Sequence, residues 1–288
     1  MRLMDDCLAR GYSIDLSTLI NSPRGCTYSV FKNEVEYILR CPNIPRLPRE
    51  DISPTLYKQK KEEFDAVFAR FSELVKVSKQ IGEGVIAPID VFCSGRRLCY
   101  IVQSTRDLLS LNELKSMEIS DRLFALKGFC STLLKLHRLD LVHGNISYNT
   151  LRVAMTSSGK PVIKISEVLD FFHSQYPPPS ALIIQSETYQ SPEMVEYRNG
   201  DNAVSQQITC ATDIFSAGIL FHEILSGALP DYSGKENGRQ LYQAINSDES
   251  YKLNEIIPVK MQHLIKKMLE RNPDNRPTIQ EIYEKISE

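Results

Sequence analysis

A loop at residues 143–151 holds several of the side chains in this sequence that could do chemistry. It reads His-Gly-Asn-Ile-Ser-Tyr-Asn-Thr-Leu, so that an imidazole, amides and hydroxyls stand close together along the chain. The amide of Asn145 can orient a hydroxyl group, but it has no basic site near neutral pH and cannot take a proton. The residue types therefore favour orientation of a polar group at Asn145 over proton transfer.

Regular elements are predicted on both sides of this loop. A helix that ends at His137 runs into the apolar step Leu141-Val142, and a short strand follows at 162–166. Upstream, β-branched and aromatic residues predict strands at 14–21, 26–32, 35–41, 85–93 and 98–104, with an amphipathic helix from Tyr57 to Lys79. Further helices are predicted at 108–114, 121–137, 213–225, 239–246, 261–271 and 278–287. Strands followed by helices predict an α+β fold.

Composition and charge limit the classes of function. The chain has 288 residues, 42% hydrophobic and 24% charged, as expected of a globular protein. Its net charge of −2 gives no general attraction to nucleic acid or anionic membranes, and no apolar run predicts membrane insertion or a secretion signal. Seven cysteines without a CxxC pair predict reduced thiols in a cytoplasmic protein. Cys93 and Cys99 flank a turn and are interpreted as strand residues rather than as a disulfide.

Three motifs in the second half of the chain occur in a familiar order. Residues 189–193 read Tyr-Gln-Ser-Pro-Glu, 211–220 read Ala-Thr-Asp-Ile-Phe-Ser-Ala-Gly-Ile-Leu, and 271–278 read Arg-Asn-Pro-Asp-Asn-Arg-Pro-Thr. With the loop at His143, they resemble the protein kinase family over nearly the whole chain. The resemblance implies one bilobal α+β domain, 1–288. Its N-lobe, about 12–103, would be a small antiparallel sheet with one main helix, and its C-lobe, about 104–288, would be mostly α-helical.

The resemblance also implies a set of scaffold residues. Glu193 and Arg276 are expected to form a buried ion pair, and Asp213 is expected to brace the backbone of the catalytic loop. His143 is expected to hold that loop in place. A retained scaffold implies the fold and not the activity.

The loop that cradles phosphates in the family departs from its pattern here. Of its three glycine positions only the middle one is kept, as Gly25, while Pro23 and Tyr28 occupy the other two. Such a loop depends on close approach of backbone N–H groups to phosphate. The segment is therefore interpreted first as an ordinary strand-turn-strand hairpin. In the alternative interpretation, as the counterpart of the phosphate loop, Tyr28 is expected to cover the pocket rather than to open it.

Three further nucleotide-binding positions are assigned by the resemblance. Arg40 stands in place of the lysine that contacts the phosphates, and its planar guanidinium does not substitute freely for an ammonium group. Glu73 on the predicted helix is its expected partner, with Glu63 as the alternative. Gln103 occupies the gatekeeper position.

Within the loop at 143–151, the resemblance places Asn145 where the family has its catalytic Asp. Ser147 replaces a lysine that contacts the γ-phosphate, and Thr150 replaces an asparagine that binds metal. A one-residue deletion in the alignment would give that metal role to Asn149 instead. Gly144 replaces an arginine that receives activation-loop phosphate in many kinases.

The second metal-binding position falls on residues 167–169, Glu-Val-Leu, where the family has Asp-Phe-Gly. Glu167 is a carboxylate and is the expected Mg²⁺ ligand. A shifted register that begins at Asp170 is the alternative.

These changes together predict a pseudokinase, a catalytically impaired kinase-like domain that acts as a protein-interaction or allosteric module. Its implied partner is another protein, such as a kinase or a signalling complex. ATP and Mg²⁺ are the cofactors of the family, and the pseudokinase interpretation requires neither. The alternatives are a divergent Ser/Thr protein kinase that uses ATP and a nucleotide-binding switch without turnover.

Overall fold

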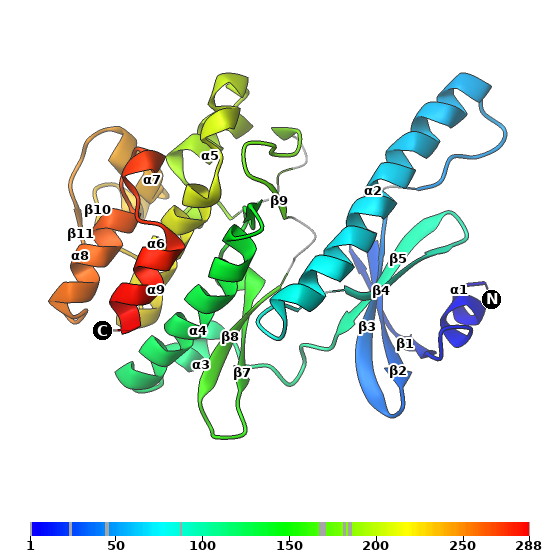
Figure 1. Cartoon of the computed structure of the whole chain (residues 1–288), viewed down its shortest axis with the longest axis horizontal. Helices are drawn as coiled ribbons and strands as arrows, with labels where there is room; N and C mark the ends of the chain where they lie inside the picture. Colours follow the sequence, from blue (N-terminus) through cyan, green and yellow to red (C-terminus); the bar gives the residue numbers. More distant parts are fainter. Residues whose placement is uncertain are drawn as a thin grey trace. The chain divides into compact units, whose positions relative to one another are not determined.

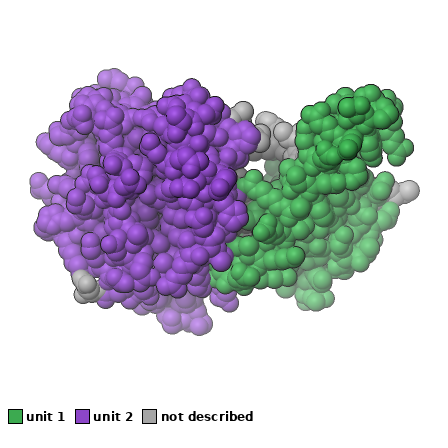
Figure 2. Space-filling view, turned by 45° about the horizontal axis from the view of Figure 1, so that its top comes forward, with its two compact units in different colours: residues 1–82, 86–107 green, residues 83–85, 108–288 purple. Residues whose placement is uncertain are grey.

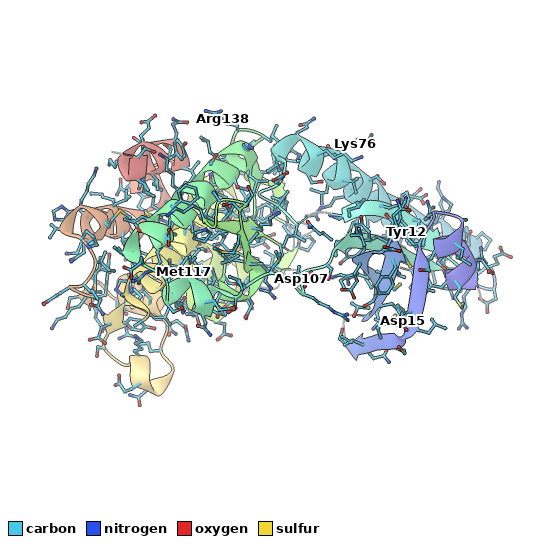
Figure 3. All side chains as sticks on the ribbon, turned by 90° about the horizontal axis from the view of Figure 1, so that it is seen from below. Tyr12, Asp15, Lys76, Asp107, Met117 and Arg138 are labelled. Carbon is cyan, nitrogen blue, oxygen red and sulfur yellow. The ribbon has the colours of Figure 1, made fainter. Side chains whose placement is uncertain are left out.

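The structure is a computed structural model that describes residues 2–22, 25–43, 46–86, 88–166, 171–180, 183 and 186–287. The chain forms two compact units, which Figure 2 colours separately. The first unit comprises Met1–Gly82 and Ile86–Asp107, and the second comprises Glu83–Val85 and Leu108–Glu288. Asp107, the last residue of the first unit, is labelled in Figure 3.

An antiparallel sheet of five strands, in the order β1-β2-β3-β5-β4, is the centre of the first unit (Figure 1). The strands are β1 (Ser13–Ser22), β2 (Gly25–Lys32), β3 (Val35–Pro42), β4 (Pro88–Ser94) and β5 (Arg97–Gln103). All five predicted strands are confirmed. The fourth begins at Pro88 rather than at Val85, because Val85 instead makes a parallel bridge to Ile165 within the second unit. Asn33 and Glu34, with φ of 51° and 66°, form the tight turn between β2 and β3.

Two helices pack against opposite faces of this sheet. The predicted long helix is confirmed as α2 (Pro54–Ile81), which begins at the capping residue Ser53. Phe71 of α2 contacts the ring of Tyr100 on β5, with 5.4 Å between centroids. Helix α1 (Arg2–Leu8) was not predicted, and its Cys7 packs in one buried cluster with Cys99. Because Cys99 and Tyr100 are neighbours on a strand, their side chains point to opposite faces.

All seven cysteines are free. On the β4–β5 hairpin, Cys93 lies opposite Leu98, and Cys99 lies opposite Phe92. Cys93 and Cys99 are therefore strand residues, as predicted, and do not face each other.

Helices dominate the second unit, and α6 (Cys210–Ser226) is buried along its length from Thr212 to Leu225. The predicted helices are confirmed with shifted bounds, whereas α5 (Pro192–Arg198) was not predicted. The other helices are α3 (Leu111–Lys115), α4 (Ile119–His137), α7 (Leu241–Asn246), α8 (Val259–Met268) and α9 (Ile279–Ser287). This unit also contains a two-stranded pair, β10 (Asp231–Tyr232) with β11 (Tyr251–Lys252). In the described part of the chain, no helix is long and apolar enough to cross a membrane. The predicted α+β class is confirmed.

His222 on α6 predicts a pH dependence of stability, because it is buried and both ring nitrogens contact backbone groups. Nε2 accepts a hydrogen bond from the Asn254 N–H at 2.9 Å, so Nδ1 carries the proton and donates to the Ala228 carbonyl at 2.7 Å. Burial lowers the pKa of His222 from its ordinary value of 6.5. The unfolded chain therefore binds this proton more readily, and we expect stability to fall below about pH 6.5, by at most about 1.4 kcal/mol per pH unit.

Urea unfolding between about pH 8 and about pH 5 tests this expectation. The variant His222→Gln should lose less stability on acidification than the unchanged protein. His263→Gln, at an exposed position on α8, is the matched control and should follow the unchanged protein. The same acid sensitivity in all three proteins would show that His222 does not contribute.

Candidate functional site

Short elements fix both ends of the loop at 143–151. Strand β6 (Leu141–Val142) leads into it and pairs with β9 (Phe172–His173). A 3-10 turn (Tyr148–Thr150) leads out of it into β7 (Leu151–Met155), which pairs with β8 (Pro161–Ile165). The apolar step and the following strand of the sequence therefore position this loop.

Asp213, in the first turn of α6, holds the backbone of the loop. The N–H groups of His143 and Gly144 donate to its Oδ2 and Oδ1, both at 2.8 Å. His137 Nε2 lies 3.0 Å from Oδ2. The carboxylate is 1% exposed, and the positive end of the helix dipole stabilises its charge. Gly144 has a φ of 70°, a conformation in which a residue with a side chain would be strained.

The ring of His143 is engaged at both nitrogens. Its Nδ1 accepts a hydrogen bond from the Asn145 N–H at 3.1 Å. The proton therefore resides on Nε2, which donates to the Ser166 carbonyl at 3.1 Å. The ring is fully buried and lies 5.0 Å from the ring centroid of Phe171. In this arrangement the imidazole positions backbone groups and has no free lone pair with which to accept a substrate proton.

Thr150 and Ser147 close the loop on itself. The Thr150 hydroxyl donates to the Asn145 carbonyl at 2.8 Å and accepts from the Ser147 N–H at 3.0 Å. A hydroxyl has one hydrogen and two lone pairs, so little capacity is left at Thr150 for a metal ion. Ser147 is 2% exposed, and its hydroxyl lies 3.3 Å from that of Thr150. The two positions that would bind metal and phosphate in an active kinase thus make contacts inside the loop.

The described residues of the loop fit Mg²⁺ poorly. Mg²⁺ prefers carboxylate ligands, and no Asp or Glu occurs between Leu141 and Ser166. Asn149, the alternative metal ligand, is an exposed residue of the 3-10 turn. Glu167 and Asp170 lie outside the described residues. Within the described ranges, no three His, Cys, Asp or Glu side chains gather as a metal site.

The packing of β2 against β3 and the buried cluster beside α1 accounts for Gly25 and Tyr28. Gly25 has a φ of 147°, and a Cβ there would lie 2.4 Å from the Cys41 carbonyl oxygen. Close approach of β3 therefore accounts for this glycine without a phosphate. Tyr28 lies opposite Leu39 and packs with the same buried cluster. Arg40, the next residue along β3, points to the other face of the sheet. The expectation that Tyr28 covers a nucleotide pocket stays a prediction.

Arg40, Glu73 and Gln103 occupy different parts of the first unit. Arg40 is half-buried on β3 opposite Tyr100, whose ring contacts Phe71 of α2. Arg40 therefore shares a sheet face with α2. Glu73 is exposed on α2, and Gln103 is exposed at the end of β5. The nucleotide-binding roles of these three residues stay predictions.

A buried polar network around Glu223 was not predicted from the sequence. The Glu223 carboxylate accepts a hydrogen bond from the Tyr189 hydroxyl and pairs with Lys115. Ser216 donates to the Tyr189 carbonyl at 2.7 Å. Burial raises the pKa of Tyr189, so its hydroxyl remains a donor. The sequence did contain a signal for this network: Glu223 is the single acid in the apolar run 214–225, and a buried carboxylate needs hydrogen-bond or ionic partners.

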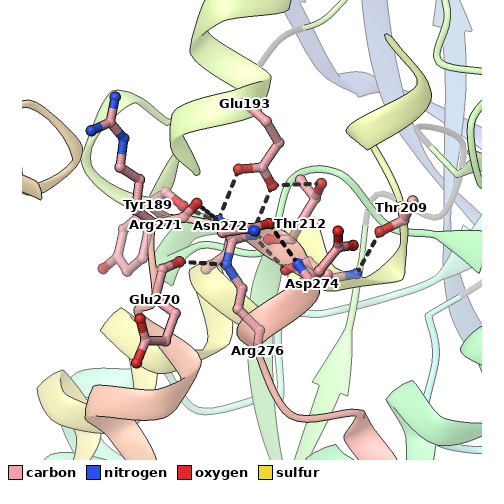
Figure 4. Close-up of polar contacts among 11 residues, drawn as sticks. Tyr189, Glu193, Thr209, Thr212, Glu270, Arg271, Asn272, Asp274 and Arg276 are labelled. Carbon is pink, nitrogen blue, oxygen red and sulfur yellow. Dashed lines mark hydrogen bonds and ion pairs between the residues drawn. The ribbon is translucent and has the colours of Figure 1, made fainter. Parts of the chain in front are cut away.

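Glu193 and Arg276 form a buried, bidentate ion pair (Figure 4). Nη1 lies 2.8 Å from Oε1 and Nη2 lies 2.9 Å from Oε2, with side chains 0% and 2% exposed for Arg276 and Glu193. Thr212 adds a hydrogen bond to Oε1 at 2.9 Å. The guanidinium also donates to the backbone carbonyls of Ala211, Glu270 and Arg271. The pair thus joins α5 and α6 to the segment before α9.

Comparisons with known proteins identify a family that this chain resembles. The family model described as "Protein kinase domain" matches residues 56–286, most of the chain. "Putative serine/threonine-protein kinase YPL150W" of Saccharomyces cerevisiae is 26% identical over 94 residues, which are 33% of this chain and 9% of that protein. This chain thus covers a small part of that relative's length. The family match begins in α2, after Gly25 and Arg40, and includes the loop at 143–151. The chain therefore belongs to the protein kinase domain family and has its bilobal α+β fold.

Proposed function

We propose that this protein is a pseudokinase, a catalytically impaired kinase domain that acts as a protein-interaction or allosteric regulatory module. The observation that supports this most is the state of the loop at 143–151. Asn145 stands at the position of the catalytic base, and its amide has no basic site. His143, the nearest other base in the loop, has both ring nitrogens engaged by backbone groups.

The contributions to the rate of phosphoryl transfer that the altered residues would have made are large enough to favour impaired catalysis. A general base contributes about 10²- to 10⁴-fold to rate. Phosphoryl transfer also depends on metal ions and cations that neutralise charge on the phosphates. The hydroxyls of Thr150 and Ser147 make hydrogen bonds inside the loop. Thr150 therefore does not act as a metal ligand, and Ser147 does not supply a positive charge. Because base, metal ligand and lysine are changed together, one substitution is not expected to recover the reaction.

The retained scaffold of the kinase fold supports a role in protein binding. The contacts that hold the fold together, centred on Asp213 and on the pair Glu193–Arg276, are satisfied in detail. A folded kinase scaffold without its chemistry still presents surfaces and can change a partner's conformational equilibrium. We propose that the partner is another protein, a kinase or a member of a signalling complex in the cytoplasm.

Phosphate transfer from ATP to a generic protein substrate tests the proposal directly. We expect no Mg²⁺-dependent transfer above background by the full chain, and none by Asn145→Asp, because Thr150 and Ser147 remain. The variant Asn112→Asp, at an exposed position on α3, is the matched control for the added charge. Transfer by the unchanged chain that Glu167→Ala abolishes would overturn the proposal in favour of a divergent kinase.

Thermal unfolding with ATP, with and without Mg²⁺, separates the remaining alternatives. Nucleotide at 100 times its dissociation constant should add about 2.7 kcal/mol to the stability of a binding protein. No shift at millimolar ATP would exclude both a divergent kinase and a nucleotide switch. A shift without phosphate transfer would support the switch, with regulation by nucleotide as the mechanism of the module.

A further inference from the structure

Three cysteines lie side by side across neighbouring strands of the first unit. Cys26 on β2 is directly opposite Cys41 on β3. Cys99 on β5 immediately precedes Tyr100, the partner of Arg40 on β3. Because the strands are antiparallel, continuing the β3–β5 register by one residue places Cys99 beside Cys41. Opposite residues of an antiparallel sheet share a face. All three thiols belong to the buried cluster on the side of α1, where they are 7%, 1% and 0% exposed for Cys26, Cys41 and Cys99.

Two of these thiols lie close enough to react with each other. The Sγ atoms of Cys41 and Cys99 are 3.2 Å apart. A disulfide requires about 2.05 Å between sulfurs and Cα atoms about 4.4–6.8 Å apart. Directly opposite residues of antiparallel strands have Cα atoms about 4.5–5.5 Å apart, within that range. Small side-chain rotations, without movement of the strands, would close the remaining distance.

We propose that Cys41 and Cys99 form a redox-active dithiol that a hydroperoxide oxidises to a disulfide between β3 and β5. The Cys99 sulfur attacks the terminal oxygen of the hydroperoxide, which breaks the O–O bond and leaves Cys99 as a sulfenic acid with an alcohol or water as the reduced product. The Cys41 sulfur then attacks the Cys99 sulfur, and the hydroxyl group departs as water. The dithiol loses two electrons and two protons, and the hydroperoxide gains both.

The surroundings of the two sulfurs assign the roles. The contact with Cys41 lowers the pKa of Cys99, and the Arg97 guanidinium favours its thiolate further. The same contact and burial raise the pKa of Cys41. Because the thiolate is the nucleophile, Cys99 is the residue that attacks the oxidant and Cys41 is the one that resolves the sulfenic acid. Burial restricts the reaction to small oxidants that enter during local opening of the sheet.

Peptide mapping of the full chain after treatment with hydrogen peroxide tests the proposal. Unreacted thiols are alkylated in denaturant before digestion. We expect a cross-linked peptide that contains Cys41 and Cys99, sensitive to dithiothreitol, and loss of both residues from the alkylated fraction. The oxidised protein should also unfold at a temperature at least about 5 °C higher, because the bond restricts the unfolded chain.

Two variants keep the test decisive. Cys99→Ala removes the nucleophile and should abolish the cross-link, with circular dichroism to show that the variant is folded. Cys93→Ser alters an exposed cysteine of the same hairpin and should leave the cross-link unchanged. The proposal is overturned if Cys93 is oxidised while Cys41 and Cys99 of the unchanged chain remain alkylatable. A cross-link between Cys26 and Cys41 alone would also overturn it.

Discussion

The substitution Arg276→Ala is expected to lower the free energy of unfolding of the second unit by about 3–5 kcal/mol. The carboxylate of Glu193 is 2% exposed and would be left as a buried charge without its guanidinium, although it would still accept a hydrogen bond from the hydroxyl of Thr212. Three backbone carbonyls would lose a donor at the same time. Because a folded domain is stable by about 5–15 kcal/mol, this single change removes a large part of the total.

Urea unfolding followed by far-UV circular dichroism measures this effect. Arg271→Ala is the matched control, because Arg271 is exposed and forms an ion pair with exposed Asp248 at 3.8 Å. That variant should change stability by less than about 0.5 kcal/mol. A loss below about 1 kcal/mol in Arg276→Ala would mean that the pair is not buried in solution.

A double variant separates the ion pair from the carbonyl contacts. Glu193→Leu with Arg276→Met removes both charges, so it should destabilise less than the sum of the single changes. It should not return to full stability, because the carbonyls of Ala211, Glu270 and Arg271 still lack their donor. The structure thus predicts a partial recovery and a measurable remainder.

The larger elements could be predicted because their signals are local. Alternating apolar residues specify the strands, and the helical spacing of Phe64, Phe71 and Leu74 specifies α2. Helix α1 could not be predicted in this way. It has only seven residues, and Cys7 is its one buried side chain, so packing on the sheet and not propensity determines it.

The same distinction between local sequence signals and tertiary packing applies to the candidate site. The pair Glu193–Arg276 and the contact of Asp213 with the loop join residues that motifs identify, and the structure places them within hydrogen-bond distance. The face of the sheet that Tyr28 occupies depends on alternation along β2, which its sequence motif does not specify. The sulfur contact between Cys41 and Cys99 depends on the pairing of β3 with β5, which a single sequence does not specify.

Asp213→Asn is expected to cause the second largest loss of stability. The substitution keeps the shape of the side chain and removes its charge and one of its two acceptor oxygens. The two carboxylate oxygens accept from the His143 and Gly144 N–H groups, each at 2.8 Å, and from His137. An amide has one acceptor oxygen, so one backbone N–H of the loop would face an NH₂ group. We expect a loss of about 1.5–3 kcal/mol in urea unfolding.

Asp201→Asn is the matched control, because it makes the same chemical change at an exposed N-terminal cap where Asp201 accepts from the Ala203 N–H at 3.0 Å. Asn and Asp cap helices about equally well, so the control should be nearly neutral. Hydrogen exchange adds a local measurement. The amides of His143 and Gly144 should exchange faster in Asp213→Asn, whereas those of α9 should change only as far as global stability falls. Unchanged exchange at His143 and Gly144 would show that Asp213 does not hold the loop, and that the position of Asn145 depends on other contacts.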